Sequence, residues 1–357
     1  MNLFSTWLCG ALLFLVQGCV RPPADVTFTV PGATAPIVHG EPCEAWEFPS
    51  AGAILTRGYV GGSERAGMVC SGVLIAPDAV LTAGHCTEIE SSFFGGQGQD
   101  IETFFTLAPD VQFFGRSSSM PPGPFRQISQ LIAHPDYDRA NFALYPVGLA
   151  RLADIGVGLL QEAFDDAPTA VLSAADLGGA LQPDLVVDIV GYGRPAVDAA
   201  DGIKLKARSI VNEINATEVQ VGDALPTPVT CLGDSGGPTY LQLDDGQWPS
   251  RRLLAVTSRA YDASVCEVGG VATRCDAFRG WIDQTLRAAC LDGLRDPAQC
   301  EGGGGLARPV PVTQADGGPG PDDETPGCDC RGLPGYRGMG WAGLLPWMAA
   351  RRRREPR

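Results

Sequence analysis

The sequence predicts an all-β fold, a barrel or a sandwich, that is closed by one helix. Short runs rich in Val, Ile and Leu alternate with clusters of Gly, Pro and Asp, which is the pattern of strands joined by turns. After these runs, large apolar residues recur at helical spacing. The strand runs are Ala51–Thr56, Ser71–Ile75, Gln127–Ala133, Leu185–Val190, Arg208–Ile214 and Leu253–Thr257, and the helix has Phe278, Trp281, Ile282 and Leu286 on one face.

The segment that says most about chemistry reads Gly-Asp-Ser-Gly-Gly-Pro over residues 233–238. A serine hydroxyl becomes a nucleophile when a base takes its proton and nearby donors stabilise the negative charge that forms. Glycines on both sides let the backbone turn tightly and point its N–H groups at a reacting carbonyl. The same residue types are also ordinary in a polar surface turn, so this motif alone leaves both interpretations open.

A second motif favours the nucleophile. Residues 81–86 read Leu-Thr-Ala-Gly-His-Cys, and His85 is one of only three histidines in the chain. With residues 70–75, this motif resembles the catalytic-histidine region of the chymotrypsin/trypsin family of serine peptidases, and residues 231–238 resemble that family's nucleophile loop. The histidine precedes the serine, which is the chymotrypsin order and not the α/β-hydrolase order.

The resemblance extends from about residue 37 to residue 286 and implies the fold of that family. This fold has two six-stranded antiparallel β-barrels, the site in the crevice between them and a C-terminal helix. The first barrel is expected to hold residues 37 to about 163, and the second about residues 168 to 273.

The resemblance implies a triad in which Ser235 is the nucleophile and His85 is the general base. An aspartate between them in sequence must orient the imidazole, and Asp154, at the head of an apolar strand, is the candidate, although it comes later than usual after the His-Pro-Asp-Tyr turn at residues 134–137. The residues set aside are Asp136 and Asp138, which are ordinary in a turn, and His39 and His134, which are interpreted as structural or exposed.

The resemblance further assigns the backbone N–H groups of Gly233 and Ser235 to an oxyanion hole. It places Val229, six residues before the serine, at the floor of the specificity pocket, and the residues at the walls are Ser258, Ala260 and Gly270. Because an apolar floor would leave a lysine or arginine head desolvated and unpaired, the sequence predicts cleavage after neutral apolar residues. Arg259 stands where the family often has Trp, and would bring a cation to the edge of the cleft.

Activation is predicted at Ile37, because Ile-Val-His-Gly at residues 37–40 resembles the N-terminus that family members create by proteolysis. The freed amine of Ile37 would pair with Asp234 and set the oxyanion hole. Pro36 precedes this position, which disfavours a trypsin-like activator.

Twelve cysteines in a chain that we predict to be exported indicate disulfides. The resemblance implies the pairs Cys70–Cys86 and Cys231–Cys266. Cys290 and Cys300 are close enough in sequence for a local loop, and Cys43 and Cys275 are then left for each other. Metal ligation is the competing interpretation, but the domain has no Cys-x-x-Cys pair and no histidine pair at ligand spacing. We therefore expect no metal and no cofactor.

Residues 1–19 are interpreted as a signal peptide, since residues 8–16 form an apolar run too short to span a bilayer. The four residues that end at Cys19 resemble a bacterial lipoprotein cleavage box, which would make Cys19 a lipidated terminus. An ordinary signal cut is the alternative. Residues 20–36 would then be a propeptide or linker before the peptidase domain, residues 37–289.

The C-terminal part divides into two predicted segments. Residues 290–327 hold a Cys-containing loop and a linker rich in Gly, Pro and acidic residues, which has too few apolar residues to bury a core. Residues 328–357 contain two cysteines, an apolar stretch and four consecutive arginines. This order resembles the C-terminal sorting tails of myxobacterial surface proteins and indicates a bacterial cell-envelope protein, with anchoring to the membrane through the termini. The alternative is a disordered basic tail.

The net charge of −15 argues against nucleic acid as a partner, because phosphate binding needs a positive face on the folded domain. The sequence therefore predicts a secreted or surface-anchored serine endopeptidase that acts on proteins or peptides. Two alternatives stay open: a binding module of this fold that has lost activity, and an esterase that uses the same triad.

Overall fold

The computed structural model describes residues 37–300, apart from 38–39, 45, 115–123, 146, 175–176, 178–180, 195–200, 224–226, 243–250 and 264. The signal, lipidation and propeptide predictions fall on residues 1–36, and the linker and sorting-tail predictions fall on residues 301–357. All of these lie outside the described residues. Among the described residues, none of the helices has both the length and the apolar character that a membrane span requires.

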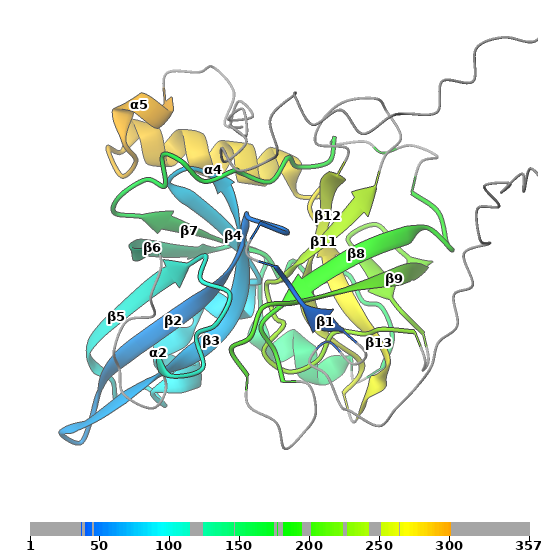
Figure 1. Cartoon of the computed structure of the whole chain (residues 1–357), viewed down its shortest axis with the longest axis horizontal. Coiled ribbons are helices and arrows are strands. Elements are labelled where there is room, and N and C mark those ends of the chain that lie inside the picture. Colours follow the sequence, from blue (N-terminus) through cyan, green and yellow to red (C-terminus); the bar gives the residue numbers. More distant parts are fainter. Residues whose placement is uncertain are drawn as a thin grey trace, which may run out of the picture. The chain divides into compact units, whose positions relative to one another are not determined.

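Six strands of the first half of the domain form a closed antiparallel barrel, in the order β2-β3-β4-β7-β6-β5 (Figure 1). Its interior is apolar and includes Ile54, Leu74, Val80 and Phe105, which are all buried. The strands are β2 (Ala51–Val60), β3 (Ser63–Ala76), β4 (Ala79–Thr82), β5 (Gln99–Thr106), β6 (Phe125–Ala133) and β7 (Gly156–Leu160).

Six strands of the second half form the other barrel, in the order β9-β10-β13-β12-β11-β8, and the pairing of β8 with β9 closes it. Val187, Val211, Val219 and Leu254 belong to its buried core. The two-barrel prediction is thereby confirmed. The strands are β8 (Val186–Gly191), β9 (Leu205–Ile214), β10 (Glu218–Val221), β11 (Pro238–Gln242), β12 (Arg251–Asp262) and β13 (Val265–Arg274).

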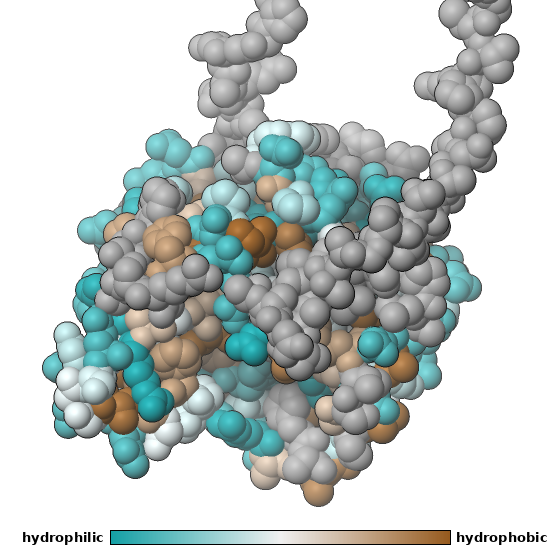
Figure 2. Space-filling model, turned by 60° about the horizontal axis from the view of Figure 1, so that its bottom comes forward, coloured by the Kyte–Doolittle hydropathy of each residue, from teal (hydrophilic) through white to brown (hydrophobic). Residues whose placement is uncertain are grey.

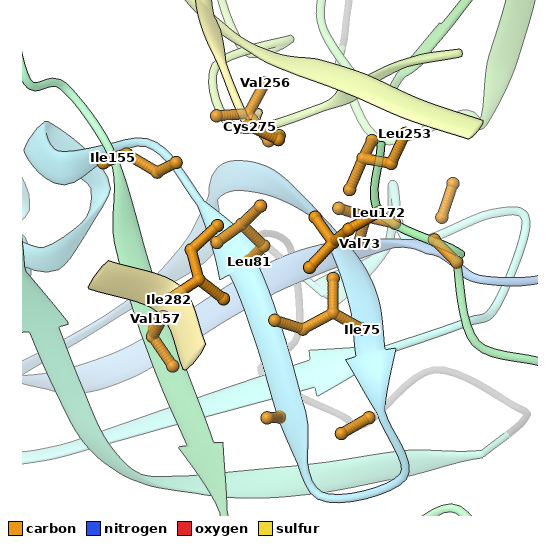
Figure 3. Packing of buried hydrophobic residues seen from close by; sticks show 14 of the residues in the cluster. Val73, Ile75, Leu81, Ile155, Val157, Leu172, Leu253, Val256, Cys275 and Ile282 are labelled. Carbon is orange, nitrogen blue, oxygen red and sulfur yellow. The ribbon is translucent and has the colours of Figure 1, made fainter. Parts of the chain in front are cut away.

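The predicted closing helix is α4 (Arg279–Leu291), and it packs on a core that both barrels share. In Figure 3, Ile282 of this helix lies beside Leu81 of β4 and Val157 of β7, and Val256 of β12 lies in the same cluster. Burial of this common core holds the two barrels together, and so sets the walls of any crevice between them. The short helices are η1 (Gly84–Thr87), α2 (Ile89–Phe93), η2 (Arg139–Leu144) and α5 (Pro297–Cys300).

The segment at the start of the domain was expected in the first barrel, but it belongs to the second barrel. Strand β1 (Glu41–Pro42) pairs with β9, with Glu41 opposite Lys206. Ile37 is fully buried in the core of the second barrel, together with Leu205. The backbone pairing and the apolar burial both attach this segment to the barrel that carries Ser235.

Three of the expected disulfides are present: Cys70–Cys86, Cys231–Cys266 and Cys290–Cys300. The fourth is a correction, because Cys43 and Cys275 are free, buried thiols. The N–H of Cys43 donates to the carbonyl of Lys204, just before β9, whereas that of Cys275 donates to the carbonyl of Leu254 on β12. Each cysteine is thus held by a different part of the second barrel's half of the structure, and burial raises the pKa of the Cys43 thiol to about 12.

Candidate active site

One buried carboxylate joins the predicted triad residues of the first barrel to the second barrel. Asp154 is fully buried just before β7, and its Oδ1 accepts the backbone N–H of His85 at 2.8 Å. Nδ1 of His85 lies 2.9 Å from Oδ2 and 3.2 Å from Oδ1 of the same carboxylate. From β12 of the second barrel, the hydroxyl of Ser258 donates to Oδ2 at 2.6 Å. The carboxylate is therefore held from both barrels, and it contacts the imidazole at Nδ1.

The electrostatics of this pair favour an ionised Asp154. Burial raises its pKa, but the charge of His85 and the hydrogen bonds from His85 and Ser258 outweigh burial and lower it. For His85, burial lowers the pKa, whereas the charge of Asp154 and the hydrogen bond to it raise it, and the net shift is upward. The pKa of an imidazole beside a carboxylate is raised because the negative charge stabilises the imidazolium.

The position of His85 follows from tight local packing. The residue lies in η1, directly after β4, and its neighbour Cys86 is bonded to Cys70 of β3. A Cβ on Gly84 would lie 3.0 Å from the ring of Tyr137 and 3.1 Å from the backbone nitrogen of Ile155. The Thr-Ala-Gly-His-Cys motif thus combines a small residue at a crowded contact with a covalent brace, and both hold the helix turn that carries the histidine.

Ser235 lies in a loop that is pressed against the first barrel. Its carbonyl accepts the N–H of Ser71 at 2.8 Å, and the hydroxyl of Ser71 donates to the carbonyl of Gly233 at 3.0 Å. Gly236 has a φ of +79°, and a Cβ there would lie 2.0 Å from the hydroxyl oxygen of Thr82. Only glycine fits such a contact, which is the structural reason for the glycines after the serine.

His85 and Ser235 line one crevice with a volume of about 580 Å³. The exposed side chains of Tyr145 and Leu232 line it as well, and Leu144 is exposed next to Tyr145 in sequence. Figure 2 shows, for one face of the molecule, that hydrophobic residues in brown reach the surface between hydrophilic ones in teal. The crevice is thus lined by both apolar and polar groups beside the histidine and the serine.

The structure separates the four residues predicted for the specificity pocket into two groups. Ser258 and Ala260 line the crevice, whereas Val229 and Gly270 do not. Val229 is fully buried, and Thr230 lines the crevice in its place. The hydroxyl of Thr230 fills the space beside Gly270, because a Cβ on that glycine would lie 2.1 Å from it.

Sequence reasoning missed the partner of Arg259. The guanidinium pairs with the carboxylate of Glu218, and Nη1 lies 2.6 Å from Oε1. Glu218 is fully buried on β10. The expected cation at the edge of the cleft is therefore compensated by a carboxylate. The only hint in the sequence is an acidic residue at the start of an apolar strand, and that pattern names no partner.

The two residues predicted for activation are both buried in the second barrel's half of the structure. Oδ1 of Asp234 accepts the N–H of Gly193 at 2.9 Å, and Oδ2 accepts that of Cys231 at 2.9 Å. Burial raises the pKa of Asp234 to about 7, although both hydrogen bonds lower it. Ile37 lies in the apolar core described above. Asp234 is thus held in place by backbone donors, with a proton affinity unusual for an aspartate.

The residues set aside from the triad occupy other places. The ring of His134 contacts the rings of Phe278 and Trp281 at centroid distances of 5.0 and 4.9 Å, and burial lowers its pKa. Oδ1 of Asp138 accepts the N–H of Ala140, as expected for a turn residue. His39 lies outside the described residues.

One group of potential metal ligands is present among the described residues. Atoms of Cys70, His85 and Cys86 lie within 4.8 Å of one another. The two sulfur atoms are bonded to each other, and a cysteine binds metal as a thiolate. This group is therefore a histidine beside a disulfide bond, and not a set of three metal ligands.

Comparisons with known proteins agree with this fold. A family model described as Trypsin matches residues 37–282. The chain is 25% identical over 268 residues to a trypsin from Saccharopolyspora erythraea, which covers 71% of this chain and 100% of that protein. It is 26% identical over 304 residues to the human chymotrypsin-like elastase family member 3A, which covers 78% of this chain and 97% of that one.

Among solved structures, that of GrC has the same fold, with a TM-score of 0.51 and 20% sequence identity. The match covers 70% of this chain and 98% of GrC. The family model spans most of the chain, including both barrels and the first turn of α4. The chain belongs to the trypsin family.

Proposed function

We propose that the protein is an exported serine endopeptidase that cleaves peptide bonds through His85, Asp154 and Ser235. The observation that carries the proposal is the buried carboxylate of Asp154, which holds Nδ1 of His85 at 2.9 Å in the crevice that Ser235 also lines. An imidazole oriented in this way is the base that a serine nucleophile needs. Three disulfides in the domain support export, since such bonds persist in oxidising compartments.

The proposed reaction has two halves. Ser235 attacks the peptide carbonyl while His85 takes the hydroxyl proton, and the backbone N–H groups of Gly233 and Ser235 stabilise the oxyanion. His85 then protonates the leaving amine, and an acyl-enzyme remains. Water attacks the ester with His85 again as base, and the acid product leaves as Ser235 regains its proton.

We infer that the residue before the cleaved bond is small and neutral. Val229 and Thr230 offer no charge near the crevice, and the hydroxyl of Thr230 fills the space beside Gly270. A lysine or arginine head there would lose its hydration without gaining a carboxylate.

A digest of a peptide library by the mature domain tests the function, with Ser235→Ala as the control. We expect cleavage by the wild type alone, and fastest after small neutral residues. A serine-directed phosphonate should add its mass to Ser235. Equal activity in the Ser235→Ala protein, or no phosphonate adduct with an intact fold, would overturn the proposed mechanism, and the second result would favour a binding module.

Activation is proposed to occur by cleavage before Ile37. The new amine would pair with Asp234, which is buried with two backbone donors, and would supply the cation that keeps this carboxylate ionised. N-terminal sequencing of the active, mature protein checks this. A fully active protein that begins upstream of Ile37 would contradict it.

A further inference from the structure

We propose that Glu218 is a specificity-determining residue that acts through Arg259: it cancels the charge of this guanidinium, so that the crevice beside Ser258 does not favour acidic residues of the substrate over neutral ones. The inference rests on the proposed peptidase function. It concerns the side of the crevice formed by β12, away from the pocket that receives the residue before the cleaved bond.

The ion pair between the two residues is close and sheltered from water. Nη1 of Arg259 lies 2.6 Å from Oε1 of Glu218, and Nη2 lies 3.3 Å from Oε2. The side chain of Glu218 is 0% exposed and that of Arg259 is 11% exposed. A two-contact pair in such a place fixes the guanidinium plane as well as its charge.

Other contacts lock this pair to the first barrel. Nη2 of Arg259 donates to the carbonyl of Gly148 at 3.2 Å, and Oε2 of Glu218 accepts the N–H of Ala150 at 2.5 Å. The N–H of Gly148 in turn donates to the carbonyl of Tyr261 on β12 at 2.8 Å. Arg259 is therefore held on the segment that leads to Asp154, and its guanidinium has one defined position.

The position of Arg259 on β12 places it at the crevice. One edge of β12 pairs with β11 as far as Val256, and further along the strand Asp262 forms a bridge with Val147. Ser258, Arg259 and Ala260 lie between these two pairings and line the crevice with His85 and Ser235. A peptide bound at Ser235 would therefore pass the guanidinium.

The net charge of the Arg259–Glu218 pair decides whether the crevice favours acidic residues in that peptide. With Glu218 ionised, the pair is neutral as a whole, and an acidic substrate residue would lose hydration without gaining a free cation. Without the charge of Glu218, the guanidinium keeps its proton and the crevice wall gains one unit of positive charge. A substrate carboxylate would then be attracted strongly, since the effective dielectric constant near a protein surface is about 20 rather than 80.

The test uses pairs of peptides that differ only by Asp or Asn at the second, third or fourth residue before the cleaved bond. We expect the wild type to cut both members of each pair at rates within about threefold. In Glu218→Gln, the ratio of kcat/KM for Asp over Asn should rise at least tenfold at one of these positions, and the rise should shrink in high salt. In Glu218→Gln/Arg259→Gln, the ratio should return to the wild-type value.

Asp78→Asn is the matched control. Asp78 pairs with Arg295 in an equally buried, two-contact geometry, and neither residue lines the crevice. This variant should lose stability without a change in the Asp/Asn ratio. An unchanged ratio in active Glu218→Gln, or the same rise in Asp78→Asn, would overturn the proposal.

Two further measurements separate this inference from the proposed function and from failure to fold. A several-fold preference of the wild type for Asp would already refute it, with no variant needed. Binding of the same peptides to Ser235→Ala and to Ser235→Ala/Glu218→Gln reports the charge of the crevice without turnover. The double variant should bind the Asp peptide at least tenfold more tightly than Ser235→Ala does. Absence of cleavage by the wild type would count against the peptidase, whereas equal binding of both peptides by both proteins would count against the role of Glu218.

Discussion

The hydroxyl of Ser258, on β12 of the second barrel, donates a hydrogen bond of 2.6 Å to Oδ2 of Asp154, which precedes β7 of the first barrel. Both side chains are buried. The contact means that the orientation of His85 depends on how the two barrels dock, and not on the first barrel alone. It also connects the candidate site to Arg259, the next residue of β12.

Asp154→Asn should reduce kcat by about 10⁴-fold if the proposed triad is correct. An amide in this place presents an N–H to Nδ1 of His85 and so favours the wrong tautomer. Rates on a library-derived peptide measure the effect, with Asp136→Asn as a control because Asp136 lies in an exposed turn. A loss of less than tenfold in a folded Asp154→Asn protein would remove Asp154 from the triad.

The pH dependence of kcat/KM should show an acid limb with its midpoint above 6.5. The pKa of His85 is raised above its ordinary value, and the proposed base must be neutral, so activity is lost as the pH falls through the pKa of His85 in the folded protein. A pH–rate profile of the mature domain locates the limb. A midpoint well below 6.5 would be inconsistent with the contact between His85 and an ionised Asp154.

Ser258→Ala should lower the free energy of unfolding by about 1.5–3 kcal/mol, the range for a hydrogen bond to a charged group. The reason is that Asp154 keeps its charge but loses one of its donors. Urea denaturation of the variant measures the change. Ser129→Ala is a suitable control, because that hydroxyl donates only to the carbonyl of Leu159 and should cost about 1 kcal/mol; equal losses would argue against a special role for Ser258.

Before cleavage, when Ile37 is still joined to Pro36, we expect the wild type to lose stability as the pH rises. Asp234→Asn should remove this loss. The pKa of Asp234 in the folded protein is raised to about 7 from an ordinary value of 3.8. The group therefore favours folding at low pH, and this stability is lost as the pH rises between about 4 and 7, by on the order of 4 kcal/mol.

Denaturation of the wild type and of Asp234→Asn at pH 4, 6 and 8 checks this prediction. The variant should be the more stable protein at pH 8, by an amount that shrinks towards pH 4. Once cleavage has freed the amine of Ile37, the wild type should instead be the more stable protein at pH 8, because the proposed pairing would stabilise the ionised carboxylate. A pH-independent difference before cleavage would show that Asp234 does not titrate in this range.

Arg295→Ala should destabilise the domain by about 3–5 kcal/mol, because it leaves the buried carboxylate of Asp78 without its partner. The pair joins the segment after α4 to the turn between β3 and β4. Arg57→Ala is the control, since the side chains of the Arg57–Glu102 pair are 34% and 40% exposed and loss of the pair should cost no more than about 1 kcal/mol. Thermal and urea unfolding would reveal whether the two losses differ.

The local chemistry of this protein can be predicted from its sequence. The apolar runs that became β2, β3, β6, β8, β9 and β12 are marked by composition and by turn residues, and α4 is marked by spacing. The motifs around His85 and Ser235 are short and continuous, so their glycines indicate tight turns and their cysteines indicate disulfide bonds. Two of the disulfides were implied by the resemblance of these motifs to the family, and the third was expected from the short spacing of Cys290 and Cys300.

Contacts across long stretches of chain were decided only by the tertiary structure. Glu218 meets Arg259 and Ser258 meets Asp154 because strand register and barrel docking bring them together. Packing also buries Val229, and it holds Cys43 and Cys275 as separate thiols although their count favoured a bond. A sequence states which groups are available, whereas their partners depend on the burial of a core shared by both barrels, which no short motif encodes.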